Sequence, residues 1–270
     1  MTQQSKSHGR KSISANSQPR ALMTQSPQLA GVWTAQILTL FPEAFPGVLG
    51  ESLTGRALKD GKWALDTIDL RLFGEGKHRN VDDTPAGGGA GMVLKPNVAG
   101  AALDRALAQQ KTPLPMVCLS PRGMPFTQAK ARAWANAGGV TMLCGRFEGI
   151  DQRVIDHYQL EEISLGDFVL TGGEIAAQAM IDATVRLLPD ILGNEASIAE
   201  ESHMAGLLEH PHYTRPALWN GRSIPDVLQS GHHINIAKWR QEMSHQVTKE
   251  KRPDLWAAFQ NALGEKDPKG

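Results

Sequence analysis

The chain has 270 residues, of which 41% are hydrophobic and 21% are charged, and its formal net charge is zero. This composition indicates a globular protein with a sizeable core. No apolar run approaches the roughly 20 residues needed to cross a bilayer, and the N-terminus lacks the apolar segment of a secretory signal. Cys118 and Cys144 each follow an apolar run. We therefore expect buried, reduced thiols in a cytoplasmic protein, and neither a disulfide framework nor a metal site.

Charged residues are unevenly distributed along the chain. Residues 1–42 contain four basic residues and no acidic residue, while residues 203–270 contain six of the nine histidines. A surface for nucleic acid would therefore be local, and the net charge neither supports nor excludes one.

The first 30 residues are rich in Ser and Gln and show no helical or strand period. They are predicted to form a disordered tail. An acid-free start with Ser and Arg also resembles a transit peptide, but a convincing amphipathic face is lacking. We favour a tail, with Met23 as a candidate internal start.

From Val32 onward, strand and helix patterns alternate. Strands are predicted from residue 32 to the turn at Pro42 and at 64–70, 115–119, 140–144 and 168–170; helices are predicted at 99–109, 128–136, 150–158 and 174–188. This alternation predicts an α/β domain over residues 31–190 with a mainly parallel sheet.

The C-terminal part has a different pattern. Residues 191–202 are polar and predicted to be an interdomain linker, and helical patterns follow at 224–228, 232–247 and 254–263 with no clear strand. Residues 203–270 are therefore predicted to form a small all-α domain.

Glycines gather in three clusters: PAGGGAGM at 85–92, CGRFEGID at 144–151 and LGDFVLTGGE at 165–174. Each adjoins or contains a predicted strand, where glycine permits tight turns and close approach of a ligand to the backbone. Neither a phosphate-binding P-loop nor a dinucleotide fingerprint is present. Three unrelated turns would explain the clusters equally well if each stood alone.

Seven motifs, however, occur in a specific order: LTLFPEAF, VDDTPAGGGAGM, LSPRG, LCGRFEGIDQRVID, SLGDFVLTGGE, LGNEAS and PHYTRP. In order and spacing the chain resembles the bacterial tRNA (guanine-N1)-methyltransferase family over residues 33 to about 260. The resemblance implies an α/β fold of the SPOUT superfamily with a deep trefoil knot, plus the small all-α C-terminal domain. It also implies methylation of N1 of guanosine 37, next to the anticodon, by S-adenosylmethionine.

The resemblance places the cofactor in three loops that form the knot. The matching residues are Leu119, Ser120, Pro121, Gly145, Arg146, Glu148, Gly149, Leu165, Gly166, Asp167, Phe168, Val169, Leu170, Gly172 and Gly173. A pocket built from backbone suits this cofactor, because main-chain N–H and C=O groups can bond to adenine while apolar side chains form the walls.

Guanine N1 carries a proton, so methyl transfer requires a base, and negative charge then develops across N1 and O6. The resemblance assigns the base to Glu201, where the family usually has aspartate, and the group that steadies O6 to Arg186. Glu200 is the neighbouring alternative for the base. Without the family, Arg186 would be interpreted as a solvated arginine at a helix end.

For the RNA, the matching positions are Asp82, Asp83, Ser197, His212, Tyr213 and Arg215. Aromatic rings can stack on bases, arginine can bind phosphate and aspartate can accept from guanine N–H groups. Ala86 and Ala90 replace residues that are often Tyr and Pro in the family. Basic residues between 238 and 252 are consistent with either a groove for the RNA backbone or a solvated helix.

The family further implies a homodimer, a tRNA with guanosines at positions 36 and 37, and a dependence on Mg²⁺, for which Glu148 is a weak candidate ligand. No membrane partner is expected. Two other hypotheses remain: a related SPOUT enzyme acting on a different RNA nucleoside, and a non-catalytic RNA-binding protein of the same fold.

Overall fold

The computed structural model describes residues 31–192 and 206–264. The predicted tail and most of the predicted linker, with Glu195, Ser197, Glu200 and Glu201, lie outside the described residues.

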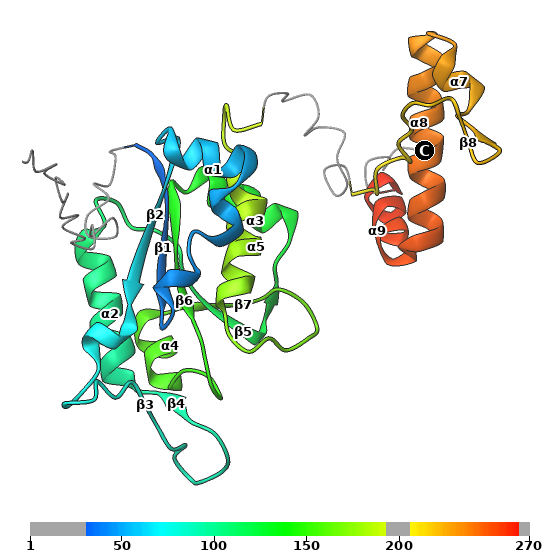
Figure 1. Cartoon of the computed structure of the whole chain (residues 1–270). Coiled ribbons are helices and arrows are strands. Elements are labelled where there is room, and N and C mark those ends of the chain that lie inside the picture. Colours follow the sequence, from blue (N-terminus) through cyan, green and yellow to red (C-terminus); the bar gives the residue numbers. More distant parts are fainter. Residues whose placement is uncertain (1–30, 193–205, 265–270) are drawn as a thin grey trace, which may run out of the picture.

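A five-stranded sheet forms the centre of residues 31–192 (Figure 1). Its strands, in spatial order, are β2 (Trp63–Asp69), β1 (Trp33–Thr39), β6 (Gly139–Cys144), β5 (Met116–Pro125) and β7 (Glu161–Ser164). All neighbouring strands are parallel. Because a parallel sheet is covered on both faces, every residue of β1 and β6 is buried, including the polar Thr34, Gln36, Thr39 and Thr141. The predicted α/β fold with a parallel sheet is confirmed.

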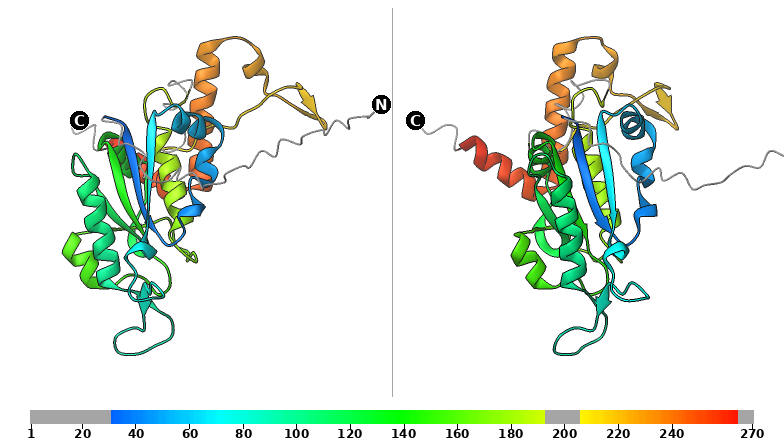
Figure 2. Two further views of the ribbon diagram at one scale, coloured as in Figure 1. Left: turned by 60° about the vertical axis from the view of Figure 1, so that its left-hand side comes forward. Right: turned by 90° about the vertical axis from the view of Figure 1, so that its left-hand side faces the viewer.

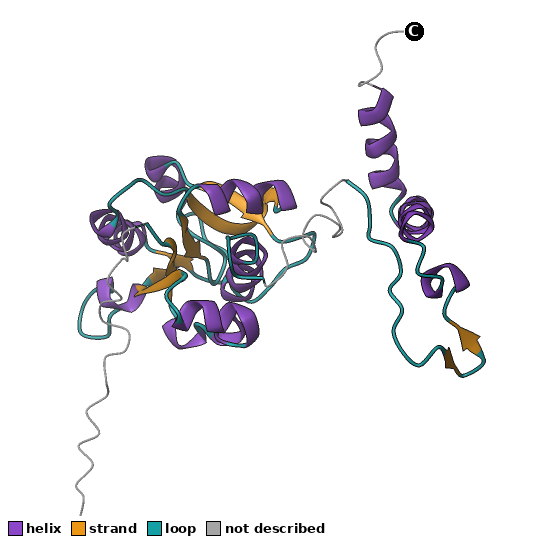
Figure 3. Cartoon of the chain, turned by 90° about the horizontal axis from the view of Figure 1, so that it is seen from above, coloured by secondary structure: helices purple, strands orange, loops and turns teal. Residues whose placement is uncertain are grey.

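Helices cover both faces of this sheet (Figure 3). One face packs against α1 (Ser52–Lys59), α3 (Gln128–Asn136) and α5 (Glu174–Val185), and the other packs against α2 (Pro96–Gln109) and α4 (Gln152–Tyr158). Side chains alternate along β1: Trp33, Ala35 and Ile37 join the first core, whereas Leu38 joins the second. Three short 3-10 helices complete this part: η1 (Pro42–Ala44), η2 (Gly47–Gly50) and η3 (Leu70–Phe73).

A small antiparallel pair lies outside the main sheet. Strands β3 (Asp82–Asp83) and β4 (Val93–Leu94) carry the first glycine cluster between them. Their loop extends beyond the end of the sheet in every view (Figures 1 and 2).

Most predicted elements agree with the structure to within a few residues, and α3 has the predicted bounds. The strand predicted at 168–170 is wrong. The fifth strand of the sheet is β7, and residues 168–170 lie in the loop after it. Phe168 and Val169 are 54% and 82% exposed, so this apolar run does not belong to the buried sheet.

The C-terminal part contains the predicted helices, as α7 (Asp226–Gln229), α8 (His233–Lys251) and α9 (Pro253–Gly264). The expectation that it contains no strand is wrong, because β8 (Leu218–Trp219) and β9 (Arg222–Ser223) form a hairpin. Asn220 and Gly221 connect them with φ values of +48° and +73°, the left-handed conformation that a tight two-residue hairpin turn requires. None of the helices in the described ranges is long and apolar enough to cross a membrane.

Candidate active site

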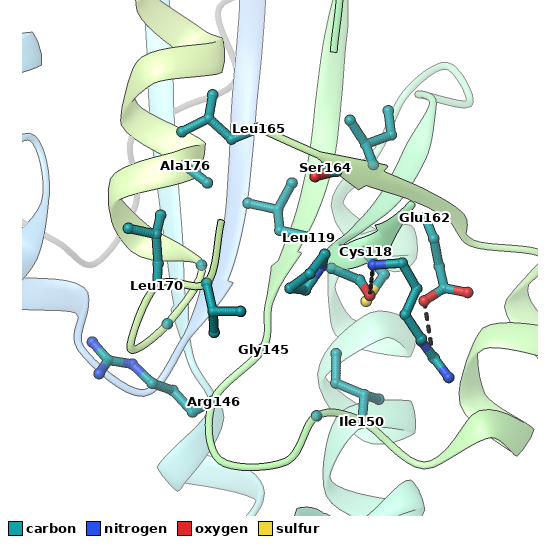
Figure 4. Close-up of a pocket in the computed structure, with 18 of the residues that line it drawn as sticks. Cys118, Leu119, Gly145, Arg146, Ile150, Glu162, Ser164, Leu165, Leu170 and Ala176 are labelled. Carbon is teal, nitrogen blue, oxygen red and sulfur yellow. Dashed lines mark hydrogen bonds and ion pairs between the residues drawn. The ribbon is translucent and has the colours of Figure 1, made fainter. Parts of the chain in front are cut away.

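A cavity of about 400 Å³ opens at the carboxyl ends of β5, β6 and β7, a size typical of small-molecule sites. In open α/β sheets, ligands bind at this edge. Strand β5, the loop after β6, and β7 with the loop that follows it bring residues 118–122, 145–150, 162–165 and 168–173 together around the cavity. Figure 4 shows Leu119, Leu165, Leu170 and Ala176 among its walls.

The structure brings nearly all the predicted cofactor residues to this cavity. Leu119, Ser120, Pro121, Gly145, Arg146, Glu148, Gly149, Leu165, Phe168, Val169, Leu170, Gly172 and Gly173 line it. Gly166 and Asp167 do not. The hydroxyl of Ser164 accepts from the Gly166 N–H and donates to the Gly166 carbonyl, so this glycine forms a turn behind the wall.

Further lining residues were not predicted individually: Cys118, Arg122, Phe147, Ile150, Ile155, Glu162, Ile163, Ser164, Thr171 and Ala176. Several of these residues lie inside the quoted family motifs, so the resemblance to the family could have identified them. Glu162, Ile163 and Ser164 belong to β7, the strand that the apolar pattern misplaced.

Two arginines border the cavity in different surroundings. Arg122 Nη2 lies 2.9 Å from Glu162 Oε1, and its side chain is 65% exposed. Arg146 is more enclosed, with 26% of its side chain exposed, and its Nη2 lies 2.9 Å from Oε2 of the buried Glu174. Figure 4 shows the Arg146 side chain pointing away from the labelled apolar side chains. Its guanidinium therefore contacts protein groups behind the cavity wall.

The first glycine loop joins the same region through the backbone. The Glu148 N–H donates to the Met92 carbonyl at 2.9 Å, and the Leu94 N–H donates to the Gly149 carbonyl at 3.0 Å. Gly91 has a φ of +89°, and a Cβ built on it would lie 2.4 Å from Glu148 Cγ. Only glycine allows this contact, so loop 84–92 and loop 145–151 form one unit at the cavity.

Asp82 and Asp83 form β3, at the base of this glycine loop. The Thr84 N–H donates to Asp83 Oδ1 at 2.9 Å, and Lys95 Nζ lies 3.6 Å from Asp83 Oδ2. The Thr84 hydrogen bond, followed by the charge of Lys95, lowers the pKa of Asp83. Asp83 is therefore an ionised acceptor at neutral pH.

Arg186 caps the carboxyl end of α5. The amino end of the same helix borders the cavity through Gly173 and Ala176. A helix of 12 residues is about 18 Å long, so Arg186 does not lie among the lining residues of the described cavity. The predicted base, Glu201, and the predicted RNA contact, Ser197, lie outside the described residues.

The remaining predicted RNA residues lie in an extended segment before β8. His212 Nε2 is 2.8 Å from Glu209 Oε1, Tyr213 lies beside Trp239 with ring centroids 6.2 Å apart, and Arg215 is exposed. An exposed cation thus lies two residues from a half-exposed aromatic ring, as contacts to phosphate and base would require.

Glu209, His210 and His212 offer ligand atoms within 4.8 Å of one another. Tetrahedral zinc at about 2.0–2.1 Å from its ligands needs them roughly 3.3 Å apart, and Mg²⁺ prefers an all-oxygen shell. The contact within this group joins His212 Nε2 and Glu209 Oε1 at 2.8 Å.

Known proteins share these sequence features. A family model described as tRNA (Guanine-1)-methyltransferase TrmD matches residues 34–258. A protein named tRNA (guanine-N(1)-)-methyltransferase from Ruegeria sp. (strain TM1040) is 64% identical over 238 residues, covering 88% of this chain and 98% of the relative. Proteins of the same name from Cereibacter sphaeroides (strain KD131) and Brucella suis are 64% and 55% identical over 243 and 238 residues, covering 89% and 88% of this chain and 97% and 96% of the relatives.

The family match includes all the segments that line the cavity, the glycine loop at 85–92 and the PHYTRP segment. On this evidence the chain belongs to the tRNA (guanine-1)-methyltransferase family.

Proposed function

We propose that this chain transfers the methyl group of S-adenosylmethionine to N1 of guanosine 37 in tRNAs that carry guanosines at positions 36 and 37. The observation that carries the proposal is the cavity itself, because three family motifs from separate parts of the chain converge on it.

The cavity suits S-adenosylmethionine chemically. Leu119, Ile163, Leu165 and Leu170 provide apolar surface, and the glycine-containing loops offer backbone N–H and C=O groups that can pair with adenine. When bound, the cofactor supplies a sulfonium methyl group. The wall residues then bind and orient the cofactor and exclude water from it.

For the transfer step we assign the base to Glu201 and the stabilising cation to Arg186. Glu201 would accept the N1 proton as N1 receives the methyl group that the bound cofactor would supply. Arg186 donates hydrogen bonds to O6, where negative charge develops. The helix length between Arg186 and the cavity supports a site to which two subunits contribute.

The proposed RNA contacts are Asp82, Asp83, Ser197, His212, Tyr213 and Arg215, with residues 203–270 as a helical tRNA-binding domain joined through linker 191–202. The contact between loops 84–92 and 145–151 supports this, because it places the aspartates of β3 at the base of a loop that borders the cavity.

We include a trefoil knot and a homodimer in the proposal. After β7 the chain returns to the loop of β6, where the Gly173 N–H donates to the Gly145 carbonyl at 3.0 Å, which supports a knotted path. Val169 and Ile175, beside the cavity, are 82% and 63% exposed, which supports burial against a second copy. For Mg²⁺, Glu148 is the better candidate ligand on the cavity wall, because Glu162 already pairs with Arg122.

The test is tritium transfer from labelled S-adenosylmethionine to tRNA transcripts. A transcript with guanosines at 36 and 37 should become labelled, and digestion should give 1-methylguanosine. Replacing guanosine 37 with adenosine should abolish labelling, while a matched replacement outside the anticodon loop should preserve it.

Two results would contradict the proposal. Labelling that persists without guanosine 37 would indicate a different target nucleoside. Binding of tRNA and cofactor without any transfer would indicate an RNA-binding protein that retains the fold.

A further inference from the structure

Behind the cavity wall lies a carboxylate with both oxygens engaged. Glu174, in the first turn of α5, is 3% exposed. Its Oε1 accepts from the Thr39 hydroxyl at 2.7 Å, and its Oε2 accepts from Arg146 Nε at 3.0 Å. Because Arg146 Nη2 also lies 2.9 Å from Oε2, two guanidinium nitrogens face the same oxygen.

The other side of Arg146 contacts the wall of the cavity. Its Nη1 donates to the Thr171 carbonyl at 3.2 Å, and the guanidinium lies 4.4 Å from the centroid of the Phe41 ring. A Cβ built on Gly172 would lie 2.1 Å from Arg146 Nε, so this backbone runs directly against the guanidinium. Thr171 and Gly172 both line the cavity.

These contacts join three segments that are distant in the sequence: the end of β1 with Phe41, the loop after β6, and the loop that leads into α5. A buried carboxylate is stable only when it is paired and hydrogen-bonded, so the charge of Glu174 fixes where the guanidinium lies. The guanidinium in turn fixes the backbone at 171–172. An exposed ion pair could not do this, because water competes for both partners.

We propose that Glu174 is a positioning residue for methyl transfer: through Arg146 it holds backbone 171–172 in the place where it forms the cofactor-binding wall. This inference rests on the proposed binding of S-adenosylmethionine in this cavity. Glu174 itself does not line the cavity, so its effect on the cofactor passes through Arg146.

The experiment compares the full-length parent with Glu174→Gln, Arg146→Met and the double variant. Calorimetry gives the Kd for S-adenosylmethionine and for S-adenosylhomocysteine, and thermal unfolding gives the Tm. The glutamine keeps the size of the side chain but removes the charge that holds the guanidinium.

We expect each single variant to raise both Kd values about tenfold, equivalent to a loss of about 1.4 kcal/mol of binding free energy. At saturating cofactor, kcat should fall by a smaller factor, because a displaced wall weakens ground-state and transition-state binding alike. The double variant contains no unpaired buried charge, so its loss of Tm should be smaller than the sum of the losses in the two single variants. Its Kd should stay high, because nothing then holds the wall.

A control variant removes an exposed ion pair elsewhere, whose two side chains are 32% and 44% exposed. Lys130 Nζ lies 2.5 Å from Glu161 Oε1, on the same domain but outside the cavity lining. Glu161→Gln should leave the Kd for the cofactor unchanged.

A Kd for S-adenosylmethionine equal to that of the parent, in Glu174→Gln or in the double variant, would overturn the inference. If a single variant does not fold, the Kd of the double variant provides the test. A parent protein that binds neither S-adenosylmethionine nor its product would instead contradict the proposed function.

Discussion

At the scale of single residues, burial controls the chemistry of the two thiols. Cys118 and Cys144 are 2% and 1% exposed, and neither forms a disulfide. Burial, assisted by the negative charge of Glu162, raises the pKa of Cys118 to about 12. For Cys144, burial and the charge of Glu174 raise the pKa well above its usual range. The predicted burial of both cysteines is confirmed.

Because the thiolate is the reactive form, we expect both cysteines to resist a disulfide reagent at pH 8 in the native protein. In denaturant both should react at the rate of a model thiol. Spectroscopic titration of released thiolate measures this. Rapid reaction of either cysteine in the native state would show that the cavity admits the reagent to the sulfur.

The same pKa shift makes a prediction about pH. Below about pH 9 the Cys118 thiol is protonated in both folded and unfolded chains. Between pH 9 and about 12 only the unfolded chain releases the proton, so the free energy of unfolding should fall as pH rises, by up to about 1.4 kcal/mol per pH unit. Urea unfolding at pH 8 and pH 10, with Cys118→Ala as the control, measures this contribution.

At the scale of elements, the contact between the glycine loop and the cavity loop can be tested with two alanines. Gly88 and Gly91 have φ values of +81° and +89°, so alanine is strained at both, by about 1–2 kcal/mol. A Cβ at Gly88 meets no atom within 4 Å, whereas one at Gly91 collides with Glu148. Comparing Gly88→Ala with Gly91→Ala therefore distinguishes the effect of backbone strain, which both variants have, from the effect of displacing Glu148, which only Gly91→Ala has.

We expect Gly91→Ala to raise the Kd for S-adenosylmethionine severalfold or more, because Glu148 lines the cavity and must move. Both alanines should lower thermal stability to a similar extent, because both residues have a positive φ. Gly88→Ala should nevertheless leave the Kd for S-adenosylmethionine unchanged. Equal cofactor affinities in the two variants would show that Glu148 relocates without disturbing the wall.

The strands also show which features the sequence could predict. Strand β6 and the start of β5 are mostly apolar, and every residue of β1 and β6 is buried, because a parallel sheet covered by helices buries both faces. Strand β7 has the sequence EEIS, and its two glutamates pair with Lys130 and Arg122. Because three of its four residues are polar, this edge strand has no apolar pattern that would predict it. The apolar run 168–170 predicts a strand instead, but there the chain forms an exposed part of the cavity wall.

At the scale of the whole molecule, the cavity loops were predictable only through the resemblance to a family. Composition and periodicity indicate an α/β sheet, but they contain no information on which of its loops meet. The contacts of Glu174 with Thr39 and Arg146 join positions 135 and 28 residues apart, and no local pattern marks such pairs. The C-terminal hairpin differs, because its Asn-Gly pair was a usable local signal.

The position of Arg186 makes a prediction about assembly. In one chain, α5 separates Arg186 from the cavity by about the length of the helix, 18 Å for 12 residues. If Arg186 acts on a nucleotide beside the cofactor, this separation predicts that it serves the cavity of a second copy. A symmetric dimer would then contain two sites, each built from both chains.

Mixing two inactive variants tests this arrangement. Gly172→Val should block the cofactor wall, because its side chain collides with Arg146, and Arg186→Ala or Glu201→Gln should remove a transfer group. In a refolded equal mixture half the dimers are heterodimers, and one of their two shared sites contains neither substitution. Methyl transfer should therefore return to about a quarter of the parent rate, whereas sites confined to one chain would stay inactive. Native mass spectrometry of the mixture confirms that heterodimers have formed, so that a persistent absence of transfer contradicts the shared site and does not reflect failed exchange.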